Sequence, residues 1–381
     1  MPSLASQVAS VPPSGIRRIH EIAVQLDDVL GLAIGEPDVA VAPHVLAAGS
    51  AAWLADDTNY TGNGGLPEFR QAVREKLRER NGIDVDLERI WATTGATQAL
   101  HLAMSLTLAP GDEILLPDPG YTTFPMNARM LHAEPVPYVL AVERGFLPDV
   151  DELERLVTDR TRVLMINSPS NPLGAVFPRE VLATLLDFAT RHDLWVISDE
   201  VYESFTYGRT HTSVAALDRH DRVFSVFSVS KTYALTGARV GYLVTPPAFA
   251  AVLRTYQEAI VSCVNTPAQR AAIAAIQGDQ SHVEVAAEHY RGNLDAATAL
   301  LDERGIRYLP PTGAFYLWID VSHASDGDVA AWAESFLLTQ RVSVAPGSAF
   351  GRSGEGWIRI CAAASREVLL EGLRRLPAPT P

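Results

Sequence analysis

Short apolar runs rich in β-branched residues alternate with amphipathic helical stretches through the middle of this 381-residue chain. The runs lie at residues 90–93, 113–116, 163–166, 194–198, 223–227 and 240–245. Such alternation is typical of a mostly parallel sheet with helices on both faces, because parallel strands need crossover connections. We therefore predict an α/β fold built around a mostly parallel, mixed sheet.

Candidate binding residues, most of them polar, follow several of these runs at the points where the strands should end. They are Gly95, Ala96, Thr97, Asn171, Asp199, Tyr202, Ser228 and Lys231. In open α/β sheets, ligands bind beyond the carboxyl ends of the strands. We therefore expect these residues to form one binding site.

Lys231 is the candidate with the most specific chemistry. It stands just past the apolar run 223–227, between hydroxyl side chains, which suits a polar pocket better than a solvated surface. A lysine that is desolvated, or that lies near another cation such as Arg239, loses its proton and condenses with carbonyls. Arg239 and the Ser228 hydroxyl would also give an anion two donors. The motif predicts a Schiff-base lysine beside a phosphate site, although taken alone it also suits a surface lysine after a strand.

Composition excludes several classes of function. The chain is 47% hydrophobic and 20% charged, as in ordinary globular proteins, and its net charge of −14 argues against nucleic-acid or anionic-membrane partners. No apolar run has the length of a membrane span and no signal-peptide pattern opens the chain, so we expect a cytoplasmic protein. Cys263 and Cys361 lack the spacing of a zinc site or a disulfide framework, and we expect buried thiols and no metal.

The chain suits two domains, because its character changes near residue 278. Residues 41–278 carry the alternating pattern and should form the larger, sheet-containing domain. Residues 279–381 resemble an α+β unit and should form a smaller domain. Its expected elements are a helix at 282–304, strands at 316–320 and 356–361, and a last helix at 366–376.

The N-terminal region carries weaker signals. Residues 1–15 contain two adjacent prolines and should form an arm that orders only against another surface. Residues 16–29 have apolar side chains at helical spacing. A glycine cluster at 62–65 precedes a helical stretch that should stop at Gly82. Gly35 would let the backbone approach a ligand closely, although a simple turn explains it as well.

The motif Ser228-Val-Ser-Lys231 with Arg239 resembles the cofactor-lysine motif of the class I and II aminotransferases, fold type I enzymes that use pyridoxal 5′-phosphate (PLP). The likeness covers nearly the whole chain, because many positions match the family in order. They are Gly35, Tyr60, Gly95, Tyr121, Asn171, Asp199, Tyr202, Ser228, Lys231, Arg239 and Arg359. Each has an ordinary alternative role as a turn, cap, core or salt-bridge residue, but their joint occurrence outweighs these.

The resemblance implies the PLP transferase fold, in which residues 1–40 join the smaller domain, and it implies roles at the cofactor ring. Lys231 would hold the PLP aldehyde, and Asp199 would keep the pyridine nitrogen protonated. Asn171 and Tyr202 would donate to the phenolic oxygen, and Tyr121 would stack on the ring face.

The phosphate of PLP is close to a dianion and needs several donors. The resemblance assigns it to the start of a helix at Gly95, Ala96 and Thr97, with help from Ser228 and Arg239.

Other contacts are implied for the substrate and for a second subunit. Arg359 would hold the substrate α-carboxylate through a bidentate pair, with Gly35 and Asn171 beside it. Tyr60 and Asn265 would reach the cofactor of the neighbouring subunit, which makes a homodimer part of the active site.

The implied activity is PLP-dependent transfer of an amino group between an L-amino acid and a 2-oxo acid. It would follow a ping-pong mechanism through a Lys231 aldimine, with the freed lysine as general base. A PLP-dependent C–S (β-eliminating) lyase, or a PLP enzyme of specialised amino-acid metabolism, is the alternative, because both use the same lysine.

Substrate choice stays open in the sequence. Dicarboxylate specialists of the family carry a second cation at one of two places, where this chain has Thr97 and, nearby, Ile260. Neither side chain is charged, so a neutral or aromatic donor fits at least as well as aspartate. Glutamate with 2-oxoglutarate would still suit as the acceptor pair.

Overall fold

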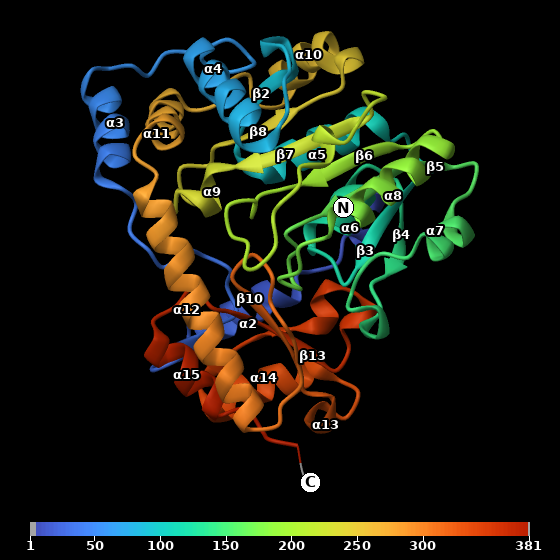
Figure 1. Cartoon of the computed structure of the whole chain (residues 1–381), viewed down its shortest axis with the longest axis vertical. Helices are drawn as coiled ribbons and strands as arrows, with labels where there is room; N and C mark the ends of the chain where they lie inside the picture. The colour runs from blue at the N-terminus through green and yellow to red at the C-terminus, as the bar shows by residue number, and fades with distance from the viewer. Residues whose placement is uncertain (1–4, 380–381) are drawn as a thin grey trace.

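A seven-stranded sheet lies in the upper part of the molecule as drawn in Figure 1. The structure is a computed structural model that describes residues 5–379. The strand order is β2 (Ile90–Thr93), β8 (Gly241–Val244), β7 (Val223–Ser228), β6 (Trp195–Asp199), β5 (Thr161–Asn167), β3 (Glu113–Asp118) and β4 (Glu134–Val139). Only β8 runs antiparallel to its neighbours. The predicted mostly parallel, mixed sheet is therefore confirmed.

Helices cover both faces of this sheet, because the strands are apolar on both sides. Val163 and Met165 of β5 pack in one cluster with α5 (Gly95–Thr107). The alternate residues, Leu164 and Ile166, pack in another with α8 (Arg179–Arg191). Other helices around the sheet are α3 (Pro43–Leu54), α4 (Pro67–Lys76), α6 (Thr123–Met130), α7 (Val150–Leu156), α10 (Ala250–Ile260) and α11 (Thr266–Gln277).

The sequence pattern missed one strand of the sheet. β4 has the sequence Glu-Pro-Val-Pro-Tyr-Val and lies outside the runs identified in the sequence; its two prolines, Pro135 and Pro137, are unusual in a strand. Proline has no N–H for a ladder and is tolerated on an edge strand. β4 occupies the edge next to β3, which explains how it accommodates them.

The C-terminal part begins with the long helix α12 (Ser281–Glu303) and contains a second, antiparallel sheet. Its strands are β12 (Ala345–Pro346), β13 (Trp357–Cys361), β10 (Tyr316–Asp320) and β9 (Tyr308–Leu309). Around it lie α13 (Ser322–Ser325), α14 (Val329–Gln340) and α15 (Arg366–Arg374).

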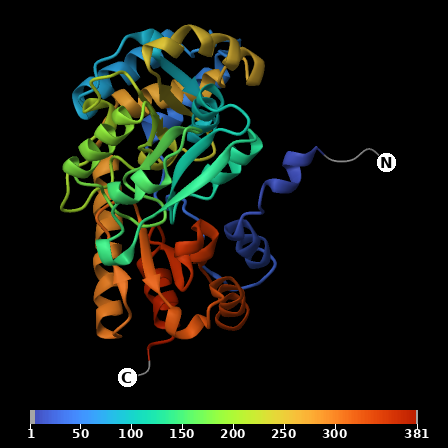
Figure 2. The same ribbon diagram turned by 90° about the vertical axis from the view of Figure 1, so that its right-hand side faces the viewer.

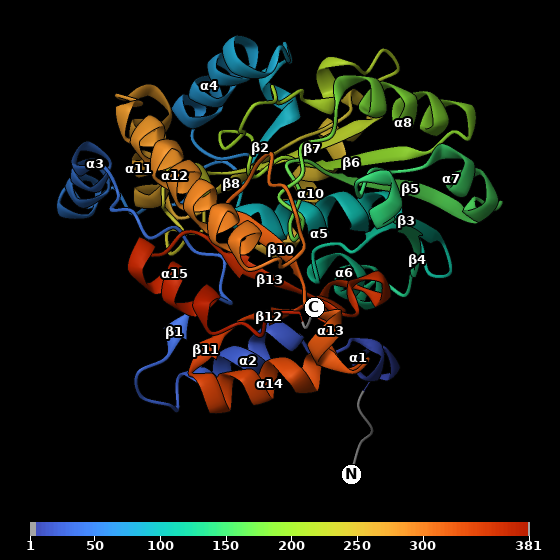
Figure 3. The same cartoon turned by 60° about the horizontal axis from the view of Figure 1, so that its bottom comes forward.

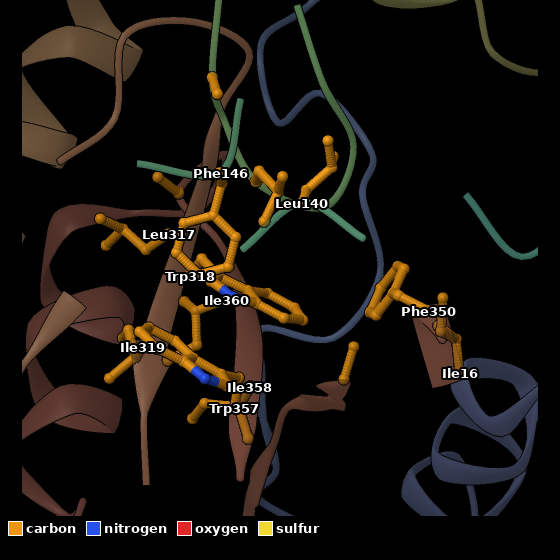
Figure 4. Packing of buried hydrophobic residues seen from close by; sticks show 14 of the residues in the cluster. Ile16, Leu140, Phe146, Leu317, Trp318, Ile319, Phe350, Trp357, Ile358 and Ile360 are labelled. Carbon is orange, nitrogen blue, oxygen red and sulfur yellow. The ribbon is translucent and has the colours of Figure 1, made fainter. Parts of the chain in front are cut away.

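An aromatic cluster fixes this second sheet in place. The ring of Trp318 in β10 stacks on that of Trp357 in β13, with centroids 6.0 Å apart, and meets Phe350 edge-on at 5.8 Å (Figure 4). Trp318 is fully buried. Ring pairs of this kind stabilise a core beyond the area that they bury.

The N-terminal segment runs along one side of the molecule, next to the C-terminal part (Figure 2). α1 (Ser6–Ser10) lies against α6, and α2 (Gly15–Ala23) packs on α14 and β12 (Figure 3). The predicted helix at 16–29 is shorter than expected: it ends at Ala23, and Asp28 adopts a left-handed φ of 56°. The chain then enters β1 (Leu30–Gly31), which pairs with β11 (Val342–Ser343).

The structure tests several of the local predictions made from the sequence. The helix after the glycine cluster ends at Gly82, whose φ of 67° closes the last turn. Cys361 is buried as predicted, but Cys263 is only half-buried, and both thiols are free. Within residues 5–379, no helix combines the length and the hydrophobicity that crossing a membrane requires. Residues 1–4 of the predicted arm lie outside the described residues.

Candidate active site

A cavity of about 610 Å³ opens beyond the carboxyl ends of β2, β5, β6 and β7. Asp199 is the last residue of β6 and Ser228 the last of β7, so the parallel strands deliver both to the same edge. The cavity brings together eleven residues that the sequence predicted as site residues. They are Gly35, Ala96, Thr97, Tyr121, Asn171, Asp199, Tyr202, Ser228, Lys231, Arg239 and Arg359.

The Lys231 amine points into this cavity from the short helix α9 (Val229–Thr232). Ser228 caps α9, because its Oγ accepts a hydrogen bond from the Ser230 N–H at 3.0 Å. Lys231 Nζ donates to the Gly35 carbonyl oxygen at 2.6 Å. Burial lowers the pKa of Lys231 to about 8. The sequence predicted Arg239 as the cation that lowers the pKa of Lys231. The charge of Arg359 lowers this pKa more than the charge of Arg239 does.

Lys231 is one of only two lysines in the chain. The other, Lys76, is buried away from the cavity and forms an ion pair with Glu203. Lys76 also lies over the Phe227 ring, 4.5 Å from its centroid. The side-chain amine available to a ligand in this cavity is therefore that of Lys231.

Asp199 is a buried acid without a cationic partner among residues 5–379. Its Oδ1 accepts one long hydrogen bond, from the Val201 N–H at 3.3 Å. Burial, with a smaller contribution from the Glu200 charge, raises the pKa of Asp199 to about 7. A protonated ring nitrogen of a ligand, placed beside the Asp199 carboxylate, would lower this raised pKa, because an opposite charge stabilises the ionised form of the acid.

Arg359 is a buried cation whose charge is not neutralised by any described residue. Its side chain is 2% exposed and stacks on Tyr316, 4.4 Å from the ring centroid. Nη1 donates to Asn171 Oδ1 at 2.7 Å and Nη2 to the Ala33 carbonyl at 2.5 Å, while Nε has no partner. The alternative of a strand salt bridge therefore does not apply. The guanidinium keeps its charge for a ligand carboxylate.

One end of the cavity forms a cradle for an anion. α5 begins there at Gly95, so its first free N–H groups face the cavity beside Ala96 and Thr97. Arg239 lies across the helix start so closely that a Cβ at residue 95 would clash with its guanidinium. Arg239 donates to the Thr236 carbonyl at 2.8 Å and forms no ion pair in the described part of the chain.

Comparison with known proteins identifies the family. The family model of aminotransferase class I and II matches residues 27–376. The chain belongs to the class I and II aminotransferases. An aspartate aminotransferase of Pyrococcus abyssi is 36% identical, with 98% of this chain and 97% of that protein covered. Aromatic-amino-acid aminotransferase 2 of Thermococcus litoralis is 34% identical, with 98% and 97% covered.

Solved structures agree with this family. An aspartate aminotransferase of Thermus thermophilus superimposes with a TM-score of 0.93 at 34% identity, with 98% of this chain and 99% of that chain covered. An aromatic aminotransferase of Pyrococcus horikoshii gives 0.89 at 36% identity, with 95% and 97% covered. The fold class and the family resemblance predicted from the sequence are confirmed, and the protein is an aminotransferase.

The structure adds a site residue of the aminotransferase that the sequence did not reveal. The Tyr316 hydroxyl hydrogen-bonds that of Tyr202 at 2.6 Å, and its ring packs under Arg359. A Cβ at Gly35 would clash with the Tyr316 hydroxyl, so a glycine is required there. Tyr316 begins a predicted strand, but only the pairing of β10 with β13 brings it beside Arg359.

Three predicted site residues do not line the cavity of the aminotransferase. Gly95 lies behind the cavity wall, under Arg239. Tyr60 is 89% exposed. Asn265 caps α11, where its Oδ1 accepts from the Ala268 N–H at 2.8 Å. Within one chain, Tyr60 and Asn265 therefore do not contribute to the site.

Proposed function

We propose that this aminotransferase holds PLP on Lys231 and exchanges the amino group between L-amino acids and 2-oxo acids. The observation that carries the proposal is one cavity that unites the Lys231 amine with the buried Asp199 and with Arg239 and Arg359, two arginines that form no ion pair with any residue between 5 and 379. The donor set fits PLP: an amine for the aldehyde, an acid for the ring nitrogen and a cationic cradle for the phosphate.

Different residues of this chain transfer the substrate proton and polarise the cofactor ring. When bound, PLP supplies an aldehyde that accepts the amino group and a ring that withdraws electrons from the substrate Cα. Lys231 Nζ, with its pKa of about 8, takes the proton from the substrate Cα and later returns it. Asp199 would keep the ring nitrogen protonated, and Asn171 and Tyr202 would donate to the phenolic oxygen. Tyr121 would hold the face of the ring.

Arg359 binds the α-carboxylate that all amino-acid substrates share. The contacts of Arg359 with Asn171 and with the Ala33 carbonyl fix its guanidinium plane before substrate arrives. A preorganised fork loses little entropy on forming a bidentate pair. The backbone at Gly35 lies beside it.

We assign the phosphate of PLP to the start of α5, Ser228 and Arg239. Gly95→Ala should lower the PLP affinity of the apoenzyme at least about tenfold, because the new Cβ displaces Arg239 and removes a charge-assisted contact. Titration of apoenzyme with PLP measures this affinity. Gly111→Ala is the matched control, because Gly111 also has a positive φ, of 89°, but nothing lies near its added Cβ. An unchanged affinity for Gly95→Ala would contradict the assignment.

We propose that the aminotransferase works as a homodimer with a shared active site. Trp53 and Leu54 at the end of α3 are 59% and 89% exposed, and Tyr60 is 89% exposed. Large exposed apolar side chains gathered in one stretch indicate an interaction surface. The same surface would bring Tyr60, with Asn265, to the cofactor of the second subunit.

We also propose a division into a large PLP-binding domain, residues 41–278, and a small domain, residues 279–381, that residues 1–40 join. The packing of α2 on α14 and the pairing of β1 with β11 support the place of the N-terminal segment.

Spectroscopy with amino acids and 2-oxo acids tests the proposed function. Purified protein loaded with PLP should convert to the pyridoxamine form when an L-amino acid is added alone. It should return to the PLP form when a 2-oxo acid follows, as ping-pong kinetics require. Release of ammonia and pyruvate from a β-substituted amino acid without any acceptor would instead indicate an eliminating lyase.

The lowered pKa of Lys231 predicts how cofactor capture depends on pH. Only the deprotonated amine attacks an aldehyde. With a pKa of about 8, roughly one tenth of the amine is free at pH 7. The rate at which apoenzyme captures PLP should therefore rise about tenfold from pH 6 to pH 7 and level off above about pH 8. Stopped-flow absorbance measures this rate. A rate that keeps rising to pH 10 would show an ordinary lysine pKa.

A further inference from the structure

Arg17 lines the active-site cavity, and the proposed function assigns no role to it. The cationic residues along the cavity are Lys231, Arg239, Arg359 and Arg17. The proposed function assigns Lys231 to the aldehyde, Arg239 to the phosphate and Arg359 to the α-carboxylate. Among the lining residues the one acid is Asp199, which faces the ring nitrogen. The positive charge of Arg17 therefore remains in the cavity without an assigned ligand group.

The Arg17 guanidinium has no ion pair or side-chain hydrogen bond within residues 5–379. Arg17 and Tyr121 both line the cavity. Burial and the Asp199 charge raise the pKa of Tyr121, and the Arg17 charge opposes this shift. The neighbouring arginine behaves differently. Arg18 donates to Glu334 of α14 through Nε at 3.0 Å and through Nη2 at 2.8 Å.

The anchoring of α2 explains why these two adjacent arginines point in different directions. Ile16 and Ile19 are buried in the C-terminal core, and Figure 4 shows Ile16 beside Phe350. Ser14 caps the helix by accepting from the Arg17 N–H at 3.4 Å. Consecutive residues of a helix are turned by about 100°, so the buried face fixes where the next side chains project. Arg17 projects to the cavity and Arg18 to α14.

We infer that Arg17 binds the distal carboxylate of an acidic substrate, an amino acid with a side-chain carboxylate or the matching 2-oxo diacid. The inference rests on the proposed function, because Arg359 must hold the α-carboxylate for the side chain to face Arg17. Thr97 and Ile260 supply no cation for this carboxylate, and the N-terminal segment supplies one instead.

Arg17 also permits donors without a distal carboxylate. Its side chain is exposed at the cavity mouth, so it keeps its hydration when an apolar substrate binds. Ile34, Leu100 and Met126 line the same cavity and offer apolar contacts. The geometry therefore favours acidic substrates without closing the site to neutral ones.

The test compares Arg17→Gln with the matched neighbour Arg18→Gln, both as PLP-loaded enzyme. The first readout is the ratio of kcat/KM for L-glutamate to that for L-leucine. The second is calorimetric binding of glutarate and of pentanoate, unreactive acids that differ by the distal carboxylate. Arg17→Gln should lower the donor ratio about 5- to 10-fold, as expected for a charge-assisted pair lost from an exposed arginine, and weaken glutarate binding by a similar factor. Pentanoate binding should change less than about threefold.

Arg18→Gln should leave the donor ratio within about twofold of the wild type, because its lost ion pair is on the surface. Arg17→Lys should keep most of the ratio, because the charge remains. An unchanged ratio in Arg17→Gln, or equal losses for both donors and both acids, would overturn the inference. Failure of the wild type to transaminate any donor would instead overturn the proposed function. The glutarate and pentanoate titrations would still decide the role of Arg17.

Discussion

Replacing Lys231 by alanine should abolish transamination, with a loss of at least about 10⁴-fold in kcat, and should remove the absorbance of lysine-bound PLP. The loss is large because one nitrogen both holds the aldehyde and moves the substrate proton. The other lysine, Lys76, is buried in its ion pair with Glu203 and cannot take over. Steady-state assays and the absorbance spectrum measure the two effects.

Two controls separate lost chemistry from lost folding in Lys231→Ala. The variant should keep its far-ultraviolet circular dichroism, because the Lys231 side chain makes one hydrogen bond, to the Gly35 carbonyl. Added methylamine should restore part of the reaction, because a free amine supplies the missing nitrogen. A variant that turns over at more than about one hundredth of the wild-type rate would contradict this role of Lys231.

Arg359→Gln should lower kcat/KM for every amino-acid donor by about 10²- to 10⁴-fold, mainly through KM. The variant loses two charge-assisted hydrogen bonds to the α-carboxylate, each worth about 1.5–3 kcal/mol. The loss in kcat/KM should be similar for all donors, because all of them carry this carboxylate. Donor titrations at saturating 2-oxo acid measure the change.

The PLP spectrum of Arg359→Gln is the check on folding, since the cofactor contacts assigned above do not include Arg359. Arg341→Gln is a matched control, because Arg341 is an exposed arginine outside the cavity without an ion pair in the described chain. Arg359→Lys should recover only part of the loss, because a lysine cannot form the bidentate fork. A loss confined to one donor would contradict the assignment of the α-carboxylate.

Local sequence patterns predicted the central sheet and the strand-end residues because both depend on short stretches of chain. The run before Asp199 and the run before Ser228 are apolar apart from Ser198 and Ser225, a near-continuous apolar pattern that is typical of strands buried on both faces. β4 escaped prediction because Pro135 and Pro137 act as breakers in isolation, and only its place at the sheet edge makes them acceptable.

The residues that were missed depend on contacts between distant parts of the chain. Tyr316 joins the site through the register of β10 with β13, which no local pattern reveals. Arg17 faces the cavity because Ile16 and Ile19 anchor α2 on the C-terminal core. The sequence does not distinguish the adjacent arginines. Only the packing shows that Arg18 pairs with Glu334, while Arg17 forms no ion pair in the described part of the chain.

The most direct measurement is reduction of the PLP-loaded protein with borohydride, followed by peptide mass spectrometry. Reduction makes the bond between PLP and its lysine permanent, and the chain offers two lysines, Lys76 and Lys231. We predict one pyridoxyl group per chain, on the peptide that contains Lys231. A protein that retains no pyridoxyl group, or that carries it on Lys76 or at the N-terminal amine, would contradict the account.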